Sequence, residues 1–213
     1  MDTNLRFHWM LPKGGEAAMK TAQETSRVRT TERTSPAALP DMEGWVEFSR
    51  RAEESGIESV LLSFSRYEPD TILTACAVGR ATTKLKFIVA YRMGLMQSTT
   101  FVQQINTLSG LIGGRVALNI VAGSSTEEQH GYGDFLEHDG RYVRAEECLA
   151  ICHSFWRHEG DTLTSKVSTV GSRVEGCTRR SSRRIEVLQK STSPDTPSRR
   201  NGWLSLVVPA GYA

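Results

Sequence analysis

The segment Gly114–Ser124, with the sequence GRVALNIVAGS, contains the clearest strand of the chain, Val116–Val121. This run is apolar except for Asn119, and near-continuous apolar runs are typical of strands buried on both faces of a parallel sheet. A glycine pair precedes the run and Gly123 follows it, so the strand is bounded on both sides. The segment therefore predicts a buried parallel strand that ends in a turn of small residues.

The same alternation of helix and strand extends from this segment toward the N-terminus. The apolar runs Ile57–Leu62 and Leu85–Tyr91 predict two more strands, and the three strand starts are 28 and 31 residues apart, about one strand–helix–strand unit. Helices are expected before each strand, capped by Asp41, Asp70 and Ser98. This alternation predicts an α/β fold with a parallel sheet covered by helices. It fits an open sheet as well as a closed eight-stranded barrel.

The two ends of the chain differ from this central part. Leu5–Leu11 predicts an opening strand, and the polar stretch Lys13–Pro40 predicts a long loop over the mouth of a pocket. In Thr162–Asn201, 21 of 40 residues are Ser, Thr or Arg, and no apolar pattern is sustained, as is typical of a segment with little core. We therefore expect a folded α/β segment, residues 1–161, followed by a largely disordered basic tail, residues 162–213.

The composition excludes several classes of protein. The 213 residues are 38% hydrophobic, which is enough to bury a core. The chain has no apolar run of 18 residues, and Met1–Asn4 does not begin a secretory signal, so we expect a cytoplasmic protein without a membrane partner. Four cysteines are too few for a disulfide scaffold. Arg179–Arg184 could bind nucleic acid, but no aromatic residue interleaves its arginines, and we expect no nucleic-acid partner.

Four ordered blocks of sequence resemble the bacterial luciferase-like flavin-dependent monooxygenases, and within them the alkanesulfonate monooxygenase branch. The blocks are Phe7–Pro12 (FHWMLP), Leu85–Arg92 (LKFIVAYR), Gly114–Ser124 and Phe135–Glu147 (FLEHDGRYVRAEE). The resemblance implies a TIM-type (β/α)8 barrel that uses reduced FMN and O2 to oxygenate a small organic substrate. It also implies a separate NAD(P)H-dependent flavin reductase as a partner.

The resemblance also implies where the flavin would lie. The candidate contacts are Ala90, Asn119, Gly123, Ser124, His138 and Tyr142. Chemistry in such barrels takes place at the carboxyl ends of the strands, where small residues let the flat flavin ring approach the backbone. Asn119 offers a donor and an acceptor to the polar edge of a flavin, or is a core amide. His138 and Tyr142 would reach the ribityl-phosphate side, with helix capping and packing as the alternative.

Two arginines are candidates for binding substrate or another anion. Arg92 follows a strand end, and a structural salt bridge is its alternative role. Arg66 is kept from a Thr-Gly-Arg turn of the resembled branch, but Glu68 stands where that branch has a cysteine, which argues against a sulfonate substrate. Arg141 could pair with a phosphate, although an arginine at such a place is more often a solvated helix residue.

Other constellations are weaker. No metal site is expected, because Cys148 and Cys152 share a helix face with apolar neighbours, which favours packing over zinc. His8 fits a core histidine better than a catalytic one. Glu127 and Glu128 are adjacent and project apart, so they do not form a catalytic carboxylate pair. No catalytic residue is assigned.

The blocks account for about four of eight strand–helix units, and a complete barrel needs about 250 residues. We expect family-like sequence to end between Trp156 and Asp161, as in a truncated or frame-shifted product. Open edges at the first and fourth strands would then favour homo-oligomers, with weak FMN binding and little turnover. Two alternatives stay open: an oxidoreductase of the same barrel type that uses the deazaflavin F420, and a non-catalytic remnant or interaction module.

Overall fold

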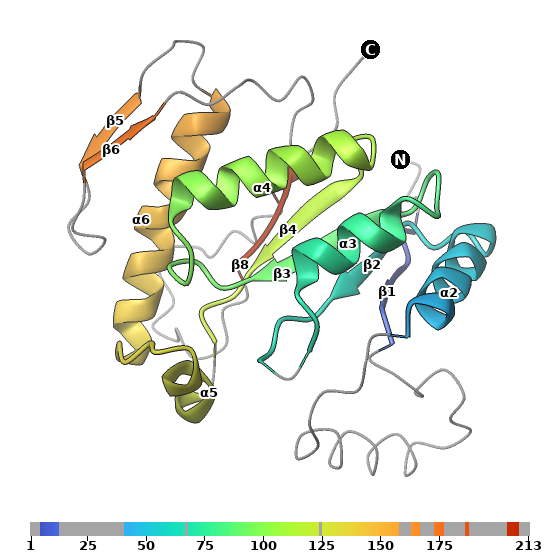
Figure 1. Cartoon of the computed structure of the whole chain (residues 1–213), viewed down its shortest axis with the longest axis horizontal. Helices are drawn as coiled ribbons and strands as arrows, with labels where there is room; N and C mark the ends of the chain where they lie inside the picture. Colours follow the sequence, from blue (N-terminus) through green and yellow to red (C-terminus); the bar gives the residue numbers. More distant parts are fainter. Residues whose placement is uncertain are drawn as a thin grey trace. The chain divides into compact units, whose positions relative to one another are not determined.

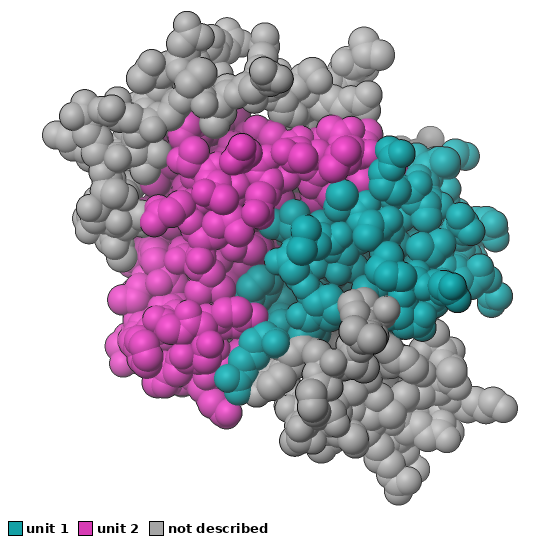
Figure 2. Space-filling view, viewed as in Figure 1, with its two compact units in different colours: residues 1–89 teal, residues 90–213 magenta. Residues whose placement is uncertain are grey.

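The computed structural model describes residues 5–12, 41–66, 68–123 and 125–157, together with the backbone of four short strands beyond them. The chain forms two compact units, Met1–Val89 and Ala90–Ala213, which are coloured separately in Figure 2. The predicted loop over residues 13–40 lies outside the described residues, as does the predicted boundary at Asp161.

Unit 1 contains three neighbouring parallel strands and the helices that connect them (Figure 1). Trp9 on the first strand pairs with Val60 on the second, which pairs with Phe87 on the third. The helix and strand order confirms the predicted alternation. The elements are β1 (His8–Met10), α2 (Met42–Glu54), β2 (Ser59–Leu62), α3 (Thr71–Gly79) and the first part of β3 (Lys86–Tyr91).

Two aspartates determine where the helices of unit 1 begin. The carboxylates of Asp41 and Asp70 accept the backbone N–H three residues further on, at 2.9 and 2.8 Å, as predicted. Leu73 in α3 is 70% exposed. The buried face of α3 is formed by residues at a spacing of three, Ile72, Ala75 and Val78.

Unit 2 continues the alternation. Its elements are the end of β3, α4 (Ser98–Leu111), β4 (Val116–Ile120), α5 (Thr126–Gly131) and α6 (His138–Arg157). Tyr91 at the end of β3 accepts the N–H of Val121 at 3.0 Å, so the carboxyl ends of β3 and β4 lie side by side. Helix α6 packs on α4, and Trp156 donates to Asn106 at 3.1 Å. Ser98 is the first helical residue of α4 and not its cap, since Gln97 takes that position.

The fourth strand is not a free edge, contrary to expectation. All five residues of β4 are buried, and β4 pairs in parallel with β7 (Glu186–Val187) and antiparallel with β8 (Leu204–Val208). A separate antiparallel pair joins β5 (Leu163–Lys166) to β6 (Arg173–Gly176).

The opposite edge of the sheet is open among the described residues. There, β1 pairs with β2 alone. Three apolar side chains in and before β1 are largely exposed: Leu5, Phe7 and Trp9 at 79%, 59% and 62%.

Candidate functional site

The carboxyl ends of β3 and β4 in unit 2 bring together several of the predicted site residues. Ala90 and Asn119 are buried near the ends of these strands, at 3% and 8% exposure. Gly123 lies three residues beyond β4 in the turn toward α5, and its backbone is in the left-handed region, with φ of +80°. Ser124, the fourth residue of this group, lies outside the described residues.

Arg92, which follows β3, is buried and paired with an acidic residue. Its Nη2 lies 2.6 Å from Oε2 of Glu128, and the two side chains are 7% and 17% exposed. The guanidinium also lies over the ring of Tyr132, 5.6 Å from the centroid. These contacts match the salt-bridge alternative for Arg92, and an additional role toward an anion stays a prediction.

Arg141 holds the turn after β4, and the expectation of a solvated side chain is wrong. It is 4% exposed and donates to three backbone carbonyls: Ala122 at 3.2 Å, Gly123 at 3.3 Å and Leu136 at 2.7 Å. A guanidinium suits this task because its fixed donors can serve several acceptors at once. The β4 turn is thereby fixed to the first turn of α6.

A second arginine fixes the loop after β3. Arg144 donates to both carboxylate oxygens of Asp134, and a β-carbon on Gly94 would collide with the Arg144 side chain. Burial would raise the pKa of Asp134, but the hydrogen bond from Arg144 and its charge lower that pKa below the ordinary value. Asp134 is therefore ionised at neutral pH and keeps Arg144 against Gly94.

His138 and Tyr142 face the same side at the start of α6, as their spacing predicts. Their ring centroids are 5.0 Å apart, with an angle of 56° between the planes. His138 is 47% exposed at its side chain, and its Nδ1 lies 3.2 Å from Oδ1 of Asp139. The two rings thus form a partly open platform at a helix start.

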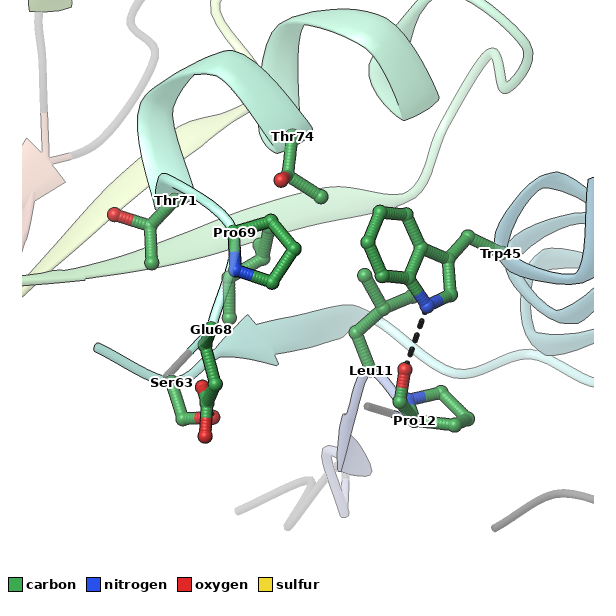
Figure 3. A pocket seen from close by; sticks show the side chains of 9 residues that line it. Leu11, Pro12, Trp45, Ser63, Glu68, Pro69, Thr71 and Thr74 are labelled. Atoms are coloured by element: carbon green, nitrogen blue, oxygen red, sulfur yellow. Dashed lines mark hydrogen bonds between the residues drawn. The ribbon is translucent and has the colours of Figure 1, made fainter. Parts of the chain in front are cut away.

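A small pocket lies in unit 1, at the carboxyl ends of β1 and β2 (Figure 3). The indole N–H of Trp45 donates to the carbonyl of Pro12 at 2.7 Å and closes one side. On the other side, Ser63 donates to Glu68 at 2.6 Å. The lining residues are Leu11, Pro12, Trp45, Leu62, Ser63, Glu68, Pro69, Thr71 and Thr74.

Arg66 is exposed and lies in the turn that leads to Glu68. The N–H of Glu68 donates to the carbonyl of Ser65 at 3.1 Å and closes this turn. The turn belongs to unit 1, and the predicted flavin contacts belong to unit 2.

Three other candidates have structural roles. His8 is exposed and shares a 2.7 Å hydrogen bond with Ser59, so the prediction of a core histidine is wrong. Cys148 and Cys152 are buried. Burial raises the pKa of both thiols, to about 12 for Cys152, so neither is a ready nucleophile.

Neither a membrane-spanning helix nor a cluster of metal ligands occurs among the described residues. No helix there combines the length and apolar character needed to span a bilayer. No three His, Cys, Asp or Glu side chains in the same part gather as a metal site would require.

Alternating strands and helices, with neighbouring parallel strands in chain order, define the described part of the chain as an α/β fold. The family model for luciferase-like monooxygenases matches residues 5–195, and the chain belongs to this family. The match continues past Asp161, so the expectation that family-like sequence ends between Trp156 and Asp161 is wrong. A domain boundary at Asp161 stays a prediction.

Solved structures show the same fold. The EDTA monooxygenase from Chelativorans sp. BNC1 is 23% identical, with 70% of this chain and 36% of that chain covered and a TM-score of 0.54. A long-chain alkane monooxygenase is 23% identical, with 73% of this chain and 39% of that chain covered and a TM-score of 0.53. The oxygenating constituent of 3,6-diketocamphane monooxygenase of Pseudomonas putida was solved with FMN. It is 17% identical, with 81% of this chain and 43% of that chain covered and a TM-score of 0.56.

The chain spans well under half the length of these structures. Its four parallel strand–helix units correspond to part of the family's TIM-type barrel.

Proposed function

We propose that this chain provides the flavin-binding part of a monooxygenase that uses reduced FMN and O2 to oxygenate a small organic substrate. The observation that carries the proposal is the β4 turn, where Gly123 in a left-handed conformation follows a buried strand inside a family match over residues 5–195. Only glycine adopts this conformation at low cost and leaves the backbone open to a flat ring. These features support a flavin site at this turn.

The residues present fit a flavin. Gly123 has no β-carbon, and the buried carboxamide of Gln129 lies where a β-carbon would be. Ala90 would leave room for the ring, and Asn119 would offer its amide to the polar edge. Reduced flavin, when bound, supplies the electrons with which O2 is activated.

The platform of His138 and Tyr142 would receive the ribityl-phosphate side. The backbone N–H groups at the start of α6 favour a negative charge there. Arg141 would keep the β4 turn in place through its three carbonyl acceptors. Ser124 would add a hydroxyl at the same turn. We assign no catalytic residue.

The substrate is proposed to be a small organic molecule other than a sulfonate. Glu68 lines the pocket of unit 1, and a carboxylate repels an anionic substrate group. Arg66 and Arg92 are the candidates for an anionic part of a substrate, although Glu128 already pairs with Arg92.

We further propose that a separate NAD(P)H-dependent reductase delivers reduced FMN in the cytoplasm. Two copies of the chain would associate through the open, apolar β1 edge. Because water must be excluded from the reacting flavin, the isolated chain is expected to bind FMN weakly and to turn over slowly.

Titration of the full chain with FMN, reduced FMN and F420, followed by absorbance and flavin fluorescence, tests the proposal. Saturable FMN binding with O2 uptake in the presence of a reductase supports it. Selective binding of F420 would favour the related oxidoreductase, and no response to any of the three would favour a non-catalytic role.

A further inference from the structure

Gln129 in α5 is a buried polar side chain without a hydrogen-bond partner among the described residues. It is 1% exposed, and neither its Nε2 nor its Oε1 forms a hydrogen bond with the described part of the chain. Leaving a buried donor and acceptor unpaired destabilises a fold, and a leucine of similar size would avoid this cost. The amide therefore needs a reason other than the stability of the ligand-free fold.

The position of the amide points to the β4 turn. A β-carbon on Gly123 would collide with Nε2 of Gln129, and it would lie 3.1 Å from Nε of Arg92. Gly123 itself is half-buried, so the carboxamide lies directly beneath a partly open surface. Helix α5, which carries Gln129, is the next element after β4 and its turn (Figure 1).

We propose that the Gln129 carboxamide contacts the bound cofactor and pairs with an N–H and an adjacent C=O of a flat ring seated at Gly123. This inference rests on the proposed function. A primary carboxamide has its donor and acceptor side by side, and the imide edge of a flavin has the complementary arrangement. Three rotatable bonds allow Gln129 to swing from beneath Gly123 to meet the ring, and glycine at position 123 leaves the path open.

The contact would be to the ring and not to the phosphate. FMN and riboflavin share the ring, so a change at Gln129 should weaken the binding of both equally. This property separates Gln129 from residues that hold the phosphate, and it can be measured without turnover.

The test uses Gln129→Leu in the full chain, with flavin fluorescence titrations and thermal unfolding in the absence of flavin. We expect FMN and riboflavin to bind about fivefold or more weakly, since about one net hydrogen bond is lost. The unfolding midpoint should stay equal or rise, because an unpaired buried amide has been removed. Gln129→Met is the second variant should the branched side chain disturb folding.

Ser109→Ala is the matched control. The Ser109 hydroxyl is also fully buried without a partner within the described residues. Ser109 belongs to the C-terminal end of α4 and not to the turn after β4, where the flavin is proposed to bind. Its removal should leave both flavin affinities unchanged.

Two results would overturn the inference while leaving the proposed function intact. The first is wild-type affinity for FMN and riboflavin in Gln129→Leu. The second is a lower unfolding midpoint in both variants, which would show that the amide is already paired in the free protein. If the wild-type chain binds neither flavin, the proposed function fails, and the inference fails with it.

Discussion

Arg92 and Glu128 form a buried ion pair that ties the loop after β3 to α5. Their Nη2 and Oε2 atoms are 2.6 Å apart, and the arginine side chain is 7% exposed. The two residues are 36 positions apart in the sequence. Because a guanidinium does not lose its charge at accessible pH, Arg92 depends on this carboxylate.

Replacing Glu128 with glutamine should therefore destabilise the chain by about 3 kcal/mol, since it removes the carboxylate charge that faces the buried guanidinium of Arg92. Urea unfolding measures the change. Glu127→Gln is the control, because Glu127 is exposed, and it should alter stability by less than about 0.5 kcal/mol. A Glu128→Gln variant as stable as the wild type would show that the pair contributes nothing.

The order of helices and strands could be predicted from the sequence because the signals are local. Asp41 and Asp70 cap helices through residues only three positions away, and an apolar run such as Val116–Val121 marks a strand on its own. The contact between the rings of His138 and Tyr142 followed from helical spacing in the same way.

The contacts that shape the candidate site could not be predicted, because their partners are distant in sequence. Arg141 donates to backbone carbonyls up to 19 positions away in the sequence. The residues next to it in the sequence do not distinguish it from a solvated arginine. Gln129 is buried because Gly123 leaves space for it, a relation visible only in the fold. His8 is exposed because β1 is an edge strand among the described residues.

Glu53 provides a prediction about pH. Burial would raise the pKa of Glu53, but hydrogen bonds from the N–H groups of Leu85 and Lys84 and from Thr83 lower it from 4.5 to about 2. A lowered pKa in the folded state means that the stabilisation is complete above pH 4.5 and is lost as the pH falls toward 2. The unfolding free energies of wild type and Glu53→Gln should therefore converge over this range.

Urea unfolding at pH 7, 5 and 3 measures this convergence. Glu54→Gln is the control, because Glu54 is the exposed neighbour of Glu53 in α2. A constant difference between wild type and Glu53→Gln from pH 7 to pH 3 would contradict the assigned hydrogen bonds.

Alanine substitutions at two glycines separate the free-energy cost of a strained backbone from the cost of a steric collision. Gly123 and Gly133 both have positive φ, at +80° and +73°, but only a β-carbon on Gly123 meets another side chain. Gly133→Ala should cost about 1 kcal/mol, from backbone strain alone. Gly123→Ala should cost about 2–4 kcal/mol, because Gln129 must also move.

Unfolding measurements on the two variants check the difference. Gly123→Ala combined with Gln129→Ala should recover the part of the loss that arises from the collision. Equal costs at positions 123 and 133 would show that Gln129 does not occupy the slot.

The neighbouring rings of His138 and Tyr142 give a prediction about the phosphate. Tyr142→Phe removes only a hydroxyl and keeps the ring that packs on His138 at 5.0 Å. If this hydroxyl donates to the phosphate, the variant should bind FMN about tenfold more weakly, because hydrogen bonds to charged groups are the stronger ones. Riboflavin, which has no phosphate, should bind with wild-type affinity.

Flavin fluorescence titrations of the full chain with both ligands measure this contrast. Val143→Ala, a change at the exposed neighbouring position of α6, is the control and should leave both affinities unchanged. If Tyr142→Phe weakens the binding of FMN and riboflavin equally, the tyrosine hydroxyl contacts the flavin ring and not the phosphate. Unchanged affinity for FMN would leave the two rings as packing at the start of α6, and the phosphate would then need another partner.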